Sequence, residues 1–120
     1  MSEQAAGRGA ATGAAADGGP AIDVAHLSRM TLGDRALMRE VLALFEGQID
    51  ALLAQIRAGG PEARVAAHTL KGSAAGIGAD AVARTAAAVE QAGEAAREPA
   101  VAALAAALAE ARAAIAGLKI

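Results

Sequence analysis

Cysteine, tryptophan and tyrosine are absent from this 120-residue chain, and a single phenylalanine is its one aromatic residue. The lack of cysteine excludes disulfides, thiolate nucleophiles and cysteine metal sites. The lack of aromatic residues argues against β-strands, which favour aromatic and β-branched side chains. About a third of the residues are alanine, the strongest helix former. We therefore expect an all-helical protein.

The chain also has no large excess of charge of one sign. It contains 11 Lys and Arg residues and 13 Asp and Glu residues, which gives a net charge of −2. This balance argues against a nucleic-acid partner. The long apolar stretches are mostly alanine and are interrupted by Glu and Arg, so we expect no membrane span. No basic start is followed by an apolar run, so we expect no secretory signal and a cytoplasmic protein.

The length suits one small domain, which we place at residues 21–120 behind a flexible tail at residues 1–20. After Met1 the tail holds only small and polar residues. Such a segment cannot bury enough apolar surface to offset the entropy lost on ordering.

Apolar spacing and turn signals predict one short helix followed by four longer ones. Asp23 is a candidate N-cap of the short helix, and Asp80 is a candidate cap further along. The longer helices are expected over residues 34–58, 61–76, 80–96 and from 99 to the end, with breaks at Gly59-Gly60-Pro61, at residues 76–80 and at Glu98-Pro99. Short connections join antiparallel neighbours, so the expected fold is an all-α, up-down antiparallel four-helix bundle with a short leading helix.

The helix at residues 34–58 holds most of the bulky apolar side chains and should be the spine of the core. Its expected core face, at steps of three, four and seven, is Leu37, Val41, Leu44, Phe45, Leu52 and Ile56. The helix at residues 61–76 has a stripe of smaller side chains: Ala63, Ala67, Leu70, Ala74 and Ile77.

Two histidines are the main candidates for reactive groups, since no phosphate-binding glycine loop, nucleophile elbow or zinc signature is present. His26 and His68 fall on different predicted helices, so they form no metal-binding pair. His68 points about 140° away from the stripe through Leu70 and Ala74, so it should face outward. An imidazole there, beside the ammonium of Lys71, suits a nucleophile that accepts a dianionic group.

Gly72 is the sharper signal, because glycine inside a helix costs about 1 kcal/mol relative to alanine. This chain uses alanine freely, and Gly72 points away from the core stripe. Its missing side chain would open the approach to His68, and the small Ala75 extends that clearing. Each of these residues alone is ordinary on a helix surface, but their combination favours a functional site. His26 has no such neighbours and is expected to be a surface or half-buried residue.

The segment AHTLKGSAAGIGA, residues 67–79, resembles the signature of histidine-containing phosphotransfer (HPt) domains. The resemblance covers about a hundred residues, from Ile22 onward. It implies a bundle whose one active histidine carries a phosphoryl group between aspartates of response-regulator receiver domains, with a hybrid sensor kinase upstream. By the same resemblance, the Mg²⁺ for this transfer belongs to the receiver domain, and the chain needs no cofactor or metal of its own.

Carried over to this chain, the resemblance makes His68 the phosphorylated residue, with Lys71 steadying the phosphoryl oxygens and Gly72 keeping the approach open. The expected partner contacts are Arg64, Val65, Lys71, Gly72 and Ala75. The family commonly places a polar residue of the next helix against the histidine. A hairpin that turns near Ala79 sets Glu90 level with His68, with Gln91 a close rival, and a carboxylate there would fix the tautomer of the ring. The alternative for Glu90 is an ordinary solvated carboxylate.

Histidine-kinase dimerisation domains also present a helical histidine, but an acidic residue usually follows it, whereas Thr69 follows here. We also see no room for an ATP-binding domain, so we expect a phosphocarrier and not a kinase, and a monomer. The alternative is a non-catalytic helical-bundle adaptor that binds a signalling partner while His68 stays unmodified. A purely structural bundle is disfavoured by the short helices and the Gly-Gly-Pro break.

Overall fold

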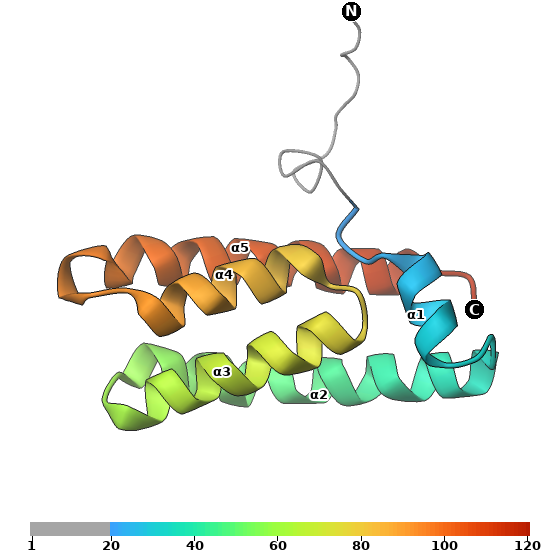
Figure 1. Cartoon of the computed structure of the whole chain (residues 1–120), viewed down its shortest axis with the longest axis horizontal. Coiled ribbons are helices and arrows are strands. Elements are labelled where there is room, and N and C mark those ends of the chain that lie inside the picture. The colour runs from blue at the N-terminus through green and yellow to red at the C-terminus, as the bar shows by residue number, and fades with distance from the viewer. Residues whose placement is uncertain (1–19) are drawn as a thin grey trace, which may run out of the picture.

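A computed structural model describes residues 20–120, which form five helices and no strand. The helices are α1 (Val24–Met30), α2 (Arg35–Ala58), α3 (Pro61–Gly76), α4 (Asp80–Gln91) and α5 (Glu94–Gly117). Figure 1 shows α2 to α5 alongside one another, joined at alternating ends, with α1 across one end. The predicted all-α bundle with a short leading helix is confirmed. Apart from Pro20, the tail expected at residues 1–20 lies outside the described residues.

Short polar side chains and glycines set most helix ends as the sequence predicts. The carboxylate of Asp23 accepts a hydrogen bond from the backbone N–H of His26 and so caps α1. Gly59 and Gly60 both have φ near +80°, and Pro61 opens α3. The expected cap at Asp80 is wrong. Ala79 holds the N-cap position, and Asp80 is already the first residue of α4, because the turn spans only residues 77–79.

The expected break at Glu98-Pro99 is also wrong, because α4 ends at Gln91 and α5 begins at Glu94. Gly93 is in an extended conformation and supplies the N-cap of α5. Pro99 lies in the second turn of α5. Proline has no N–H group, so Pro99 removes the one backbone hydrogen bond that residue 99 would donate to the carbonyl of residue 95, and α5 continues on both sides of it.

The core face of α2 is shifted by one residue relative to part of the expected stripe. Phe45 and Ile56 are buried as predicted, and Val41 and Leu52 are half-buried. Leu37 is 38% exposed and Leu44 is 63% exposed, so these two assignments are wrong. The buried residues of α2 are Met38, Leu42, Phe45, Ile49 and Ile56. Two apolar stripes of helical period run along α2, and packing against α3 and α5 buries only one of them.

The stripe of α3 is buried as predicted, and it is made largely of alanine. Ala67, Leu70 and Ala74 have no exposed surface, and Ala63 and Ile77 are buried as well. Small side chains let the backbone of α3 lie close to those of α2 and α4, which flank it. This packing fixes the rotation of α3, and therefore which of its side chains face solvent.

A close backbone contact fastens the start of α1 to the turn between α3 and α4. The N–H of Asp23 donates to the carbonyl of Gly78 over 2.8 Å. A Cβ atom on Gly78 would lie 2.7 Å from the carbonyl oxygen of Asp23, and Gly78 has φ of +80°. Only glycine meets both the steric and the conformational requirement at this position.

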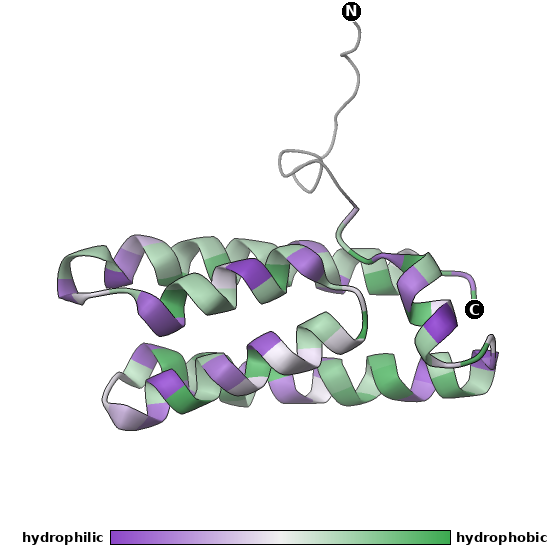
Figure 2. Ribbon diagram, viewed as in Figure 1, coloured by the Kyte–Doolittle hydropathy of each residue, from purple (hydrophilic) through white to green (hydrophobic). Residues whose placement is uncertain are grey.

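Among the described residues one helix, α5, is long and apolar enough to cross a membrane when judged by length and composition. Its ribbon is green over most of its length in Figure 2. The sequence led us to expect that no stretch would be long and apolar enough to span a membrane. By length and composition this was wrong, because the many alanines of α5 count as apolar residues although each buries little area. A core helix meets the same criterion, so the finding is weak evidence of a membrane span. In the bundle, α5 buries Val101, Leu104 and Leu108 and packs on α4 and α2.

Candidate functional site

His68 lies in the middle of α3 and faces solvent, with 67% of its side chain exposed. The buried stripe of α3 lies on the other side of the helix, at Leu70 and Ala74. The outward orientation expected from the helical period is therefore confirmed. His26, in contrast, is half-buried on α1, and its Nε2 has no hydrogen-bond partner.

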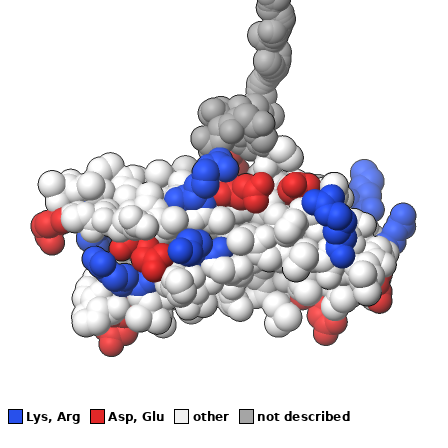
Figure 3. All heavy atoms as spheres, viewed as in Figure 1, with Lys and Arg blue, Asp and Glu red and all other residues white. Residues whose placement is uncertain are grey.

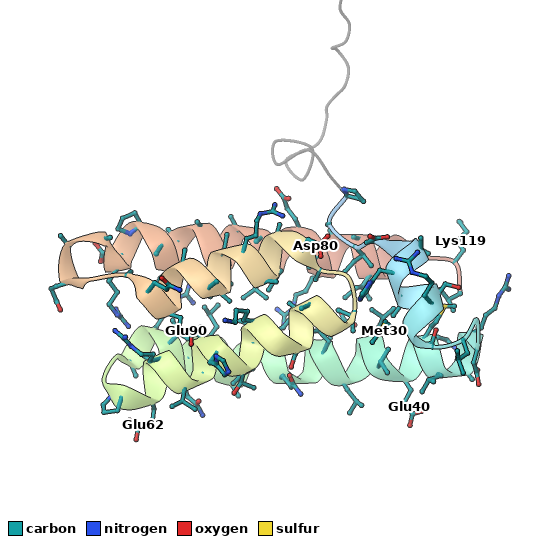
Figure 4. All side chains as sticks on the ribbon, in the orientation of Figure 1. Met30, Glu40, Glu62, Asp80, Glu90 and Lys119 are labelled. Carbon is teal, nitrogen blue, oxygen red and sulfur yellow. The ribbon has the colours of Figure 1, made fainter. Side chains whose placement is uncertain are left out.

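Glu90 of α4 reaches across to His68. Its Oε2 lies 2.8 Å from Nδ1 of the ring. Gln91, the rival from the sequence, is exposed at the last position of α4. Figure 4 shows the labelled Glu90 side chain pointing from α4 towards α3. An ionised carboxylate can only accept, so it selects the tautomer with the proton on Nδ1 and leaves the lone pair on Nε2.

Lys71 contacts the same carboxylate as His68, so that Glu90 links the two side chains of α3. Its Nζ lies 3.3 Å from Oε1 of Glu90, so the two oxygens of this carboxylate contact different residues of α3. Partial burial raises the pKa of Glu90, but hydrogen bonds from His68 and Lys71 and the charge of Lys71 outweigh it. The net pKa lies below the ordinary value of 4.5. Glu90 is therefore an anion at neutral pH. The Lys71–Glu90 pair was not predicted, although residue spacing places both groups beside His68.

Gly72 is exposed, and a Cβ atom added to it would meet no neighbouring atom within 4 Å. The protein's own packing therefore does not require glycine there. Ala75, one turn further along α3, is exposed as well. Neither residue places a large side chain on the exposed surface of α3 next to His68.

A shallow depression of about 410 Å³ adjoins His68 towards the start of α3. It is lined by Pro61, Arg64, Val65, His68, Thr69 and Glu90. Val65 is 65% exposed, an unusual exposure for a valine, and Arg64 adds a positive charge. The structure thus brings all predicted site residues to one face of α3 and the adjoining edge of α4. Pro61 and Thr69 were not singled out in the sequence, where neither carries a signal of its own.

Within residues 20–120, no group of three or more His, Asp or Glu side chains is placed to hold a metal ion. The chemistry available at this site is that of one solvent-facing imidazole nitrogen. The carboxylate of Glu90 lies at the other ring nitrogen, the ammonium of Lys71 lies nearby, and Gly72 places no side chain beside the ring.

Comparisons with known proteins agree with this arrangement. A family model described as Hpt domain matches residues 40–114, a span that contains His68, Lys71, Gly72 and Glu90. The structure is similar to the crystal structure of the histidine phosphotransferase ShpA from Caulobacter crescentus, with a TM-score of 0.66 and 33% sequence identity. That match covers 80% of this chain and 88% of the other. No curated protein matches the sequence.

Proposed function

The chain belongs to the Hpt domain family and so has a role in phosphorelay signalling; on that premise we propose that His68 carries a phosphoryl group between aspartates of receiver domains. The observation that carries the proposal is the contact of Nδ1 with Glu90, which leaves Nε2 as the nucleophilic nitrogen on an open surface.

In the proposed reaction, the lone pair of Nε2 attacks the phosphorus of an aspartyl phosphate in line with the leaving oxygen. The N–P bond forms as the P–O bond to the aspartate breaks, and the carboxylate leaves with the electron pair. The ring becomes positively charged and keeps its proton on Nδ1, where the Glu90 carboxylate stabilises it. In the second transfer another aspartate attacks the phosphorus, and the N–P electron pair returns to Nε2.

Charge stabilisation comes from both proteins. Lys71 and Arg64 supply positive charge beside the phosphoryl oxygens, since both flank His68 on its own helix. The Mg²⁺ that phosphoryl transfer requires would belong to the receiver domain. The partner would contact Arg64, Val65, Lys71, Gly72 and Ala75, and Gly72 lets it approach His68 closely.

We further propose that the protein is a cytoplasmic, monomeric phosphocarrier that takes its phosphoryl group from a hybrid sensor kinase and has no kinase activity of its own. Incubation with labelled ATP should therefore leave the isolated protein unlabelled.

The experiment that tests the function is phosphoryl transfer from a panel of labelled receiver domains. The wild-type protein should acquire an acid-labile, base-stable phosphate within minutes, His68→Ala should acquire none, and His26→Ala should match the wild type. Undiminished labelling of His68→Ala would overturn the assignment. Receiver binding without labelling of the wild type would instead favour the adaptor function.

A further inference from the structure

A second hollow, which we call the end hollow, lies where the turn between α2 and α3 meets the turn between α4 and α5. The turn residues Gly60 and Gly93 line it, together with three charged side chains: Arg64, Glu94 and Arg97. Its volume is about 200 Å³, below the roughly 300–1,000 Å³ of pockets that hold drug-sized molecules. The end hollow therefore suits a small molecule or an ion.

The guanidinium of Arg97 is held in place beside the end hollow. Its Nη2 donates a hydrogen bond to the backbone carbonyl of Ile56 in the last turn of α2, and the side chain is half-buried. A guanidinium has five N–H donors, so this contact leaves most of them for other acceptors. A cation that the fold already holds loses little freedom when it binds an anion, which favours binding.

Arg64 and Glu94 supply the other charges of the end hollow. Both are exposed, and among residues 20–120 neither has an ion pair. Two arginines and one glutamate leave the lining with a net charge of +1. Figure 3 shows blue side chains gathered on this half of the molecule, over the facing parts of α3 and α4. The lining favours an anion, and the fork of N–H groups on a guanidinium matches the oxygens of a phosphate.

Arg64 also lines the depression beside His68, so the two hollows share one side chain. It lies one helical turn before His68 on the exposed side of α3. An anion bound between Arg64 and Arg97 would hold the Arg64 guanidinium at the end of the bundle. The positive charge that Arg64 offers to the phosphoryl group on His68 would then be lost.

We propose that the end hollow binds a phosphate dianion through Arg64 and Arg97, and that this binding slows phosphoryl transfer at His68. The dianion is either inorganic phosphate or the phosphate group of a small metabolite. Binding in the end hollow is independent of the proposed function, whereas the effect on transfer rests on it.

Titration of the isotopically labelled protein with inorganic phosphate tests the binding, with sodium chloride used to keep the ionic strength constant. The backbone amide signals of Gly60 and Gly93 should shift along saturating curves. Arg97→Gln removes a charge-assisted contact and should raise Kd about tenfold. Glu94→Gln removes the one carboxylate of the lining and should lower Kd. A gain in affinity cannot come from a folding defect, so this variant keeps the test decisive.

Matched controls lie at the opposite end of the bundle. Arg35→Gln and Glu40→Gln make the same two changes on the first turns of α2 and should leave Kd unchanged. Glycerol phosphate in place of inorganic phosphate separates the two sources, since tighter binding indicates a metabolite and weaker binding indicates the free ion. Shifts that do not saturate, or a Kd that is the same in the wild type, Arg97→Gln and Glu94→Gln, would overturn the site.

Transfer from a labelled receiver domain tests the effect on His68. Saturating phosphate should slow labelling of the wild type and should slow Arg97→Gln much less, although the two label equally fast without phosphate. Any action of phosphate on the receiver domain is common to both proteins. Phosphoramidate, a small donor that reaches His68 without a partner protein, should label both proteins equally and so shows that the ring is intact.

Equal slowing of the wild type and Arg97→Gln by phosphate would overturn the link between the end hollow and His68. Failure of the wild type to be labelled by either donor would overturn the proposed function and that link with it. The titration would still decide whether the end hollow binds phosphate, because it does not depend on transfer.

Discussion

The carboxylate of Glu90 lies 2.8 Å from Nδ1 of His68, although 22 residues separate them in the chain. The hairpin formed by α3 and α4 makes this contact, with its turn at residues 77–79. The same carboxylate also holds Lys71 at 3.3 Å. One side chain therefore sets both the tautomer of the ring and the position of the nearest positive charge.

Replacing Glu90 should slow phosphoryl transfer without unfolding the bundle. In Glu90→Ala, Nδ1 loses its acceptor and the positive charge on the ring loses its counter-ion, so we expect a rate loss of roughly fivefold to tenfold for this partly exposed pair. In Glu90→Gln the side chain still offers an acceptor but carries no charge, so its transfer rate should lie between those of the wild type and Glu90→Ala. Single-turnover transfer from a labelled receiver measures this effect. Equal rates for all three proteins would show that Glu90 is an ordinary surface carboxylate.

The lowered pKa of Glu90 predicts a pH dependence of stability. Its pKa in the folded protein lies below 4.5, so its contribution is fully present above that value and is lost as the pH falls through the lower folded pKa. The difference in free energy of unfolding between wild type and Glu90→Gln should therefore shrink as the pH falls below about 4.5. Urea titrations at each pH provide the measurement. A difference that grows in acid would contradict the direction of the shift.

Gly72→Ala should make the protein more stable and a poorer phosphocarrier. Alanine at an open position inside a helix gains about 1 kcal/mol over glycine, and its Cβ meets no neighbour in this protein. The same methyl group lies where the partner must approach His68, so transfer from a receiver should slow while phosphoramidate labelling is retained. Urea unfolding and both labelling reactions test this. If Gly72→Ala is more stable but still accepts the phosphoryl group from the receiver domain at the wild-type rate, the partner does not pack on Gly72.

Lys71→Ala should slow transfer with little change in stability. Lys71 is 37% exposed, and an ion pair so close to solvent contributes little to folding. Loss of a charge-assisted contact with the phosphoryl oxygens should lower the transfer rate by roughly tenfold. Lys119→Ala serves as the control, since Figure 4 places Lys119 at the opposite end of the bundle from Glu90. If both lysine variants transfer at the wild-type rate, Lys71 has no role in the reaction.

Gly78→Ala should destabilise the fold and leave the reactivity of His68 intact. A methyl group at this position would lie 2.7 Å from the carbonyl oxygen of Asp23 and would also strain a backbone with φ of +80°. We expect a loss of about 2 kcal/mol in the free energy of unfolding. Thermal unfolding followed by circular dichroism measures it. Unchanged stability would mean that α1 does not rest on this turn in solution.

Much of the site could be predicted because it depends on local spacing. The period of α3 turns His68 away from Leu70 and Ala74, and counting through the turn near Ala79 places Glu90 opposite His68. The Gly-Gly-Pro sequence fixes the start of α3 because each of its residues has a strong conformational preference. These features depend on spacing within α3, the turn and α4, and need no knowledge of α2 and α5.

The errors arose where tertiary packing decides between local alternatives. Leu37 and Leu44 share a helical period with the core of α2, and only the placement of α3 and α5 shows that the neighbouring stripe is the buried one. Proline usually breaks a helix when it lies in the middle, but it is tolerated near the start. Gly93 sets the start of α5 six residues before Pro99. The Lys71–Glu90 pair likewise follows from the packing of α4 on α3.

Because Glu90 occupies Nδ1, the imidazole has one nitrogen to offer and one side from which it can be reached. In the proposed relay, phosphoryl donor and acceptor must therefore bind at His68 in turn, and no ternary complex of the three proteins would form. The kinetics of the relay would then be ping-pong, and a surplus of either unphosphorylated receiver would act as a competitive inhibitor of the other.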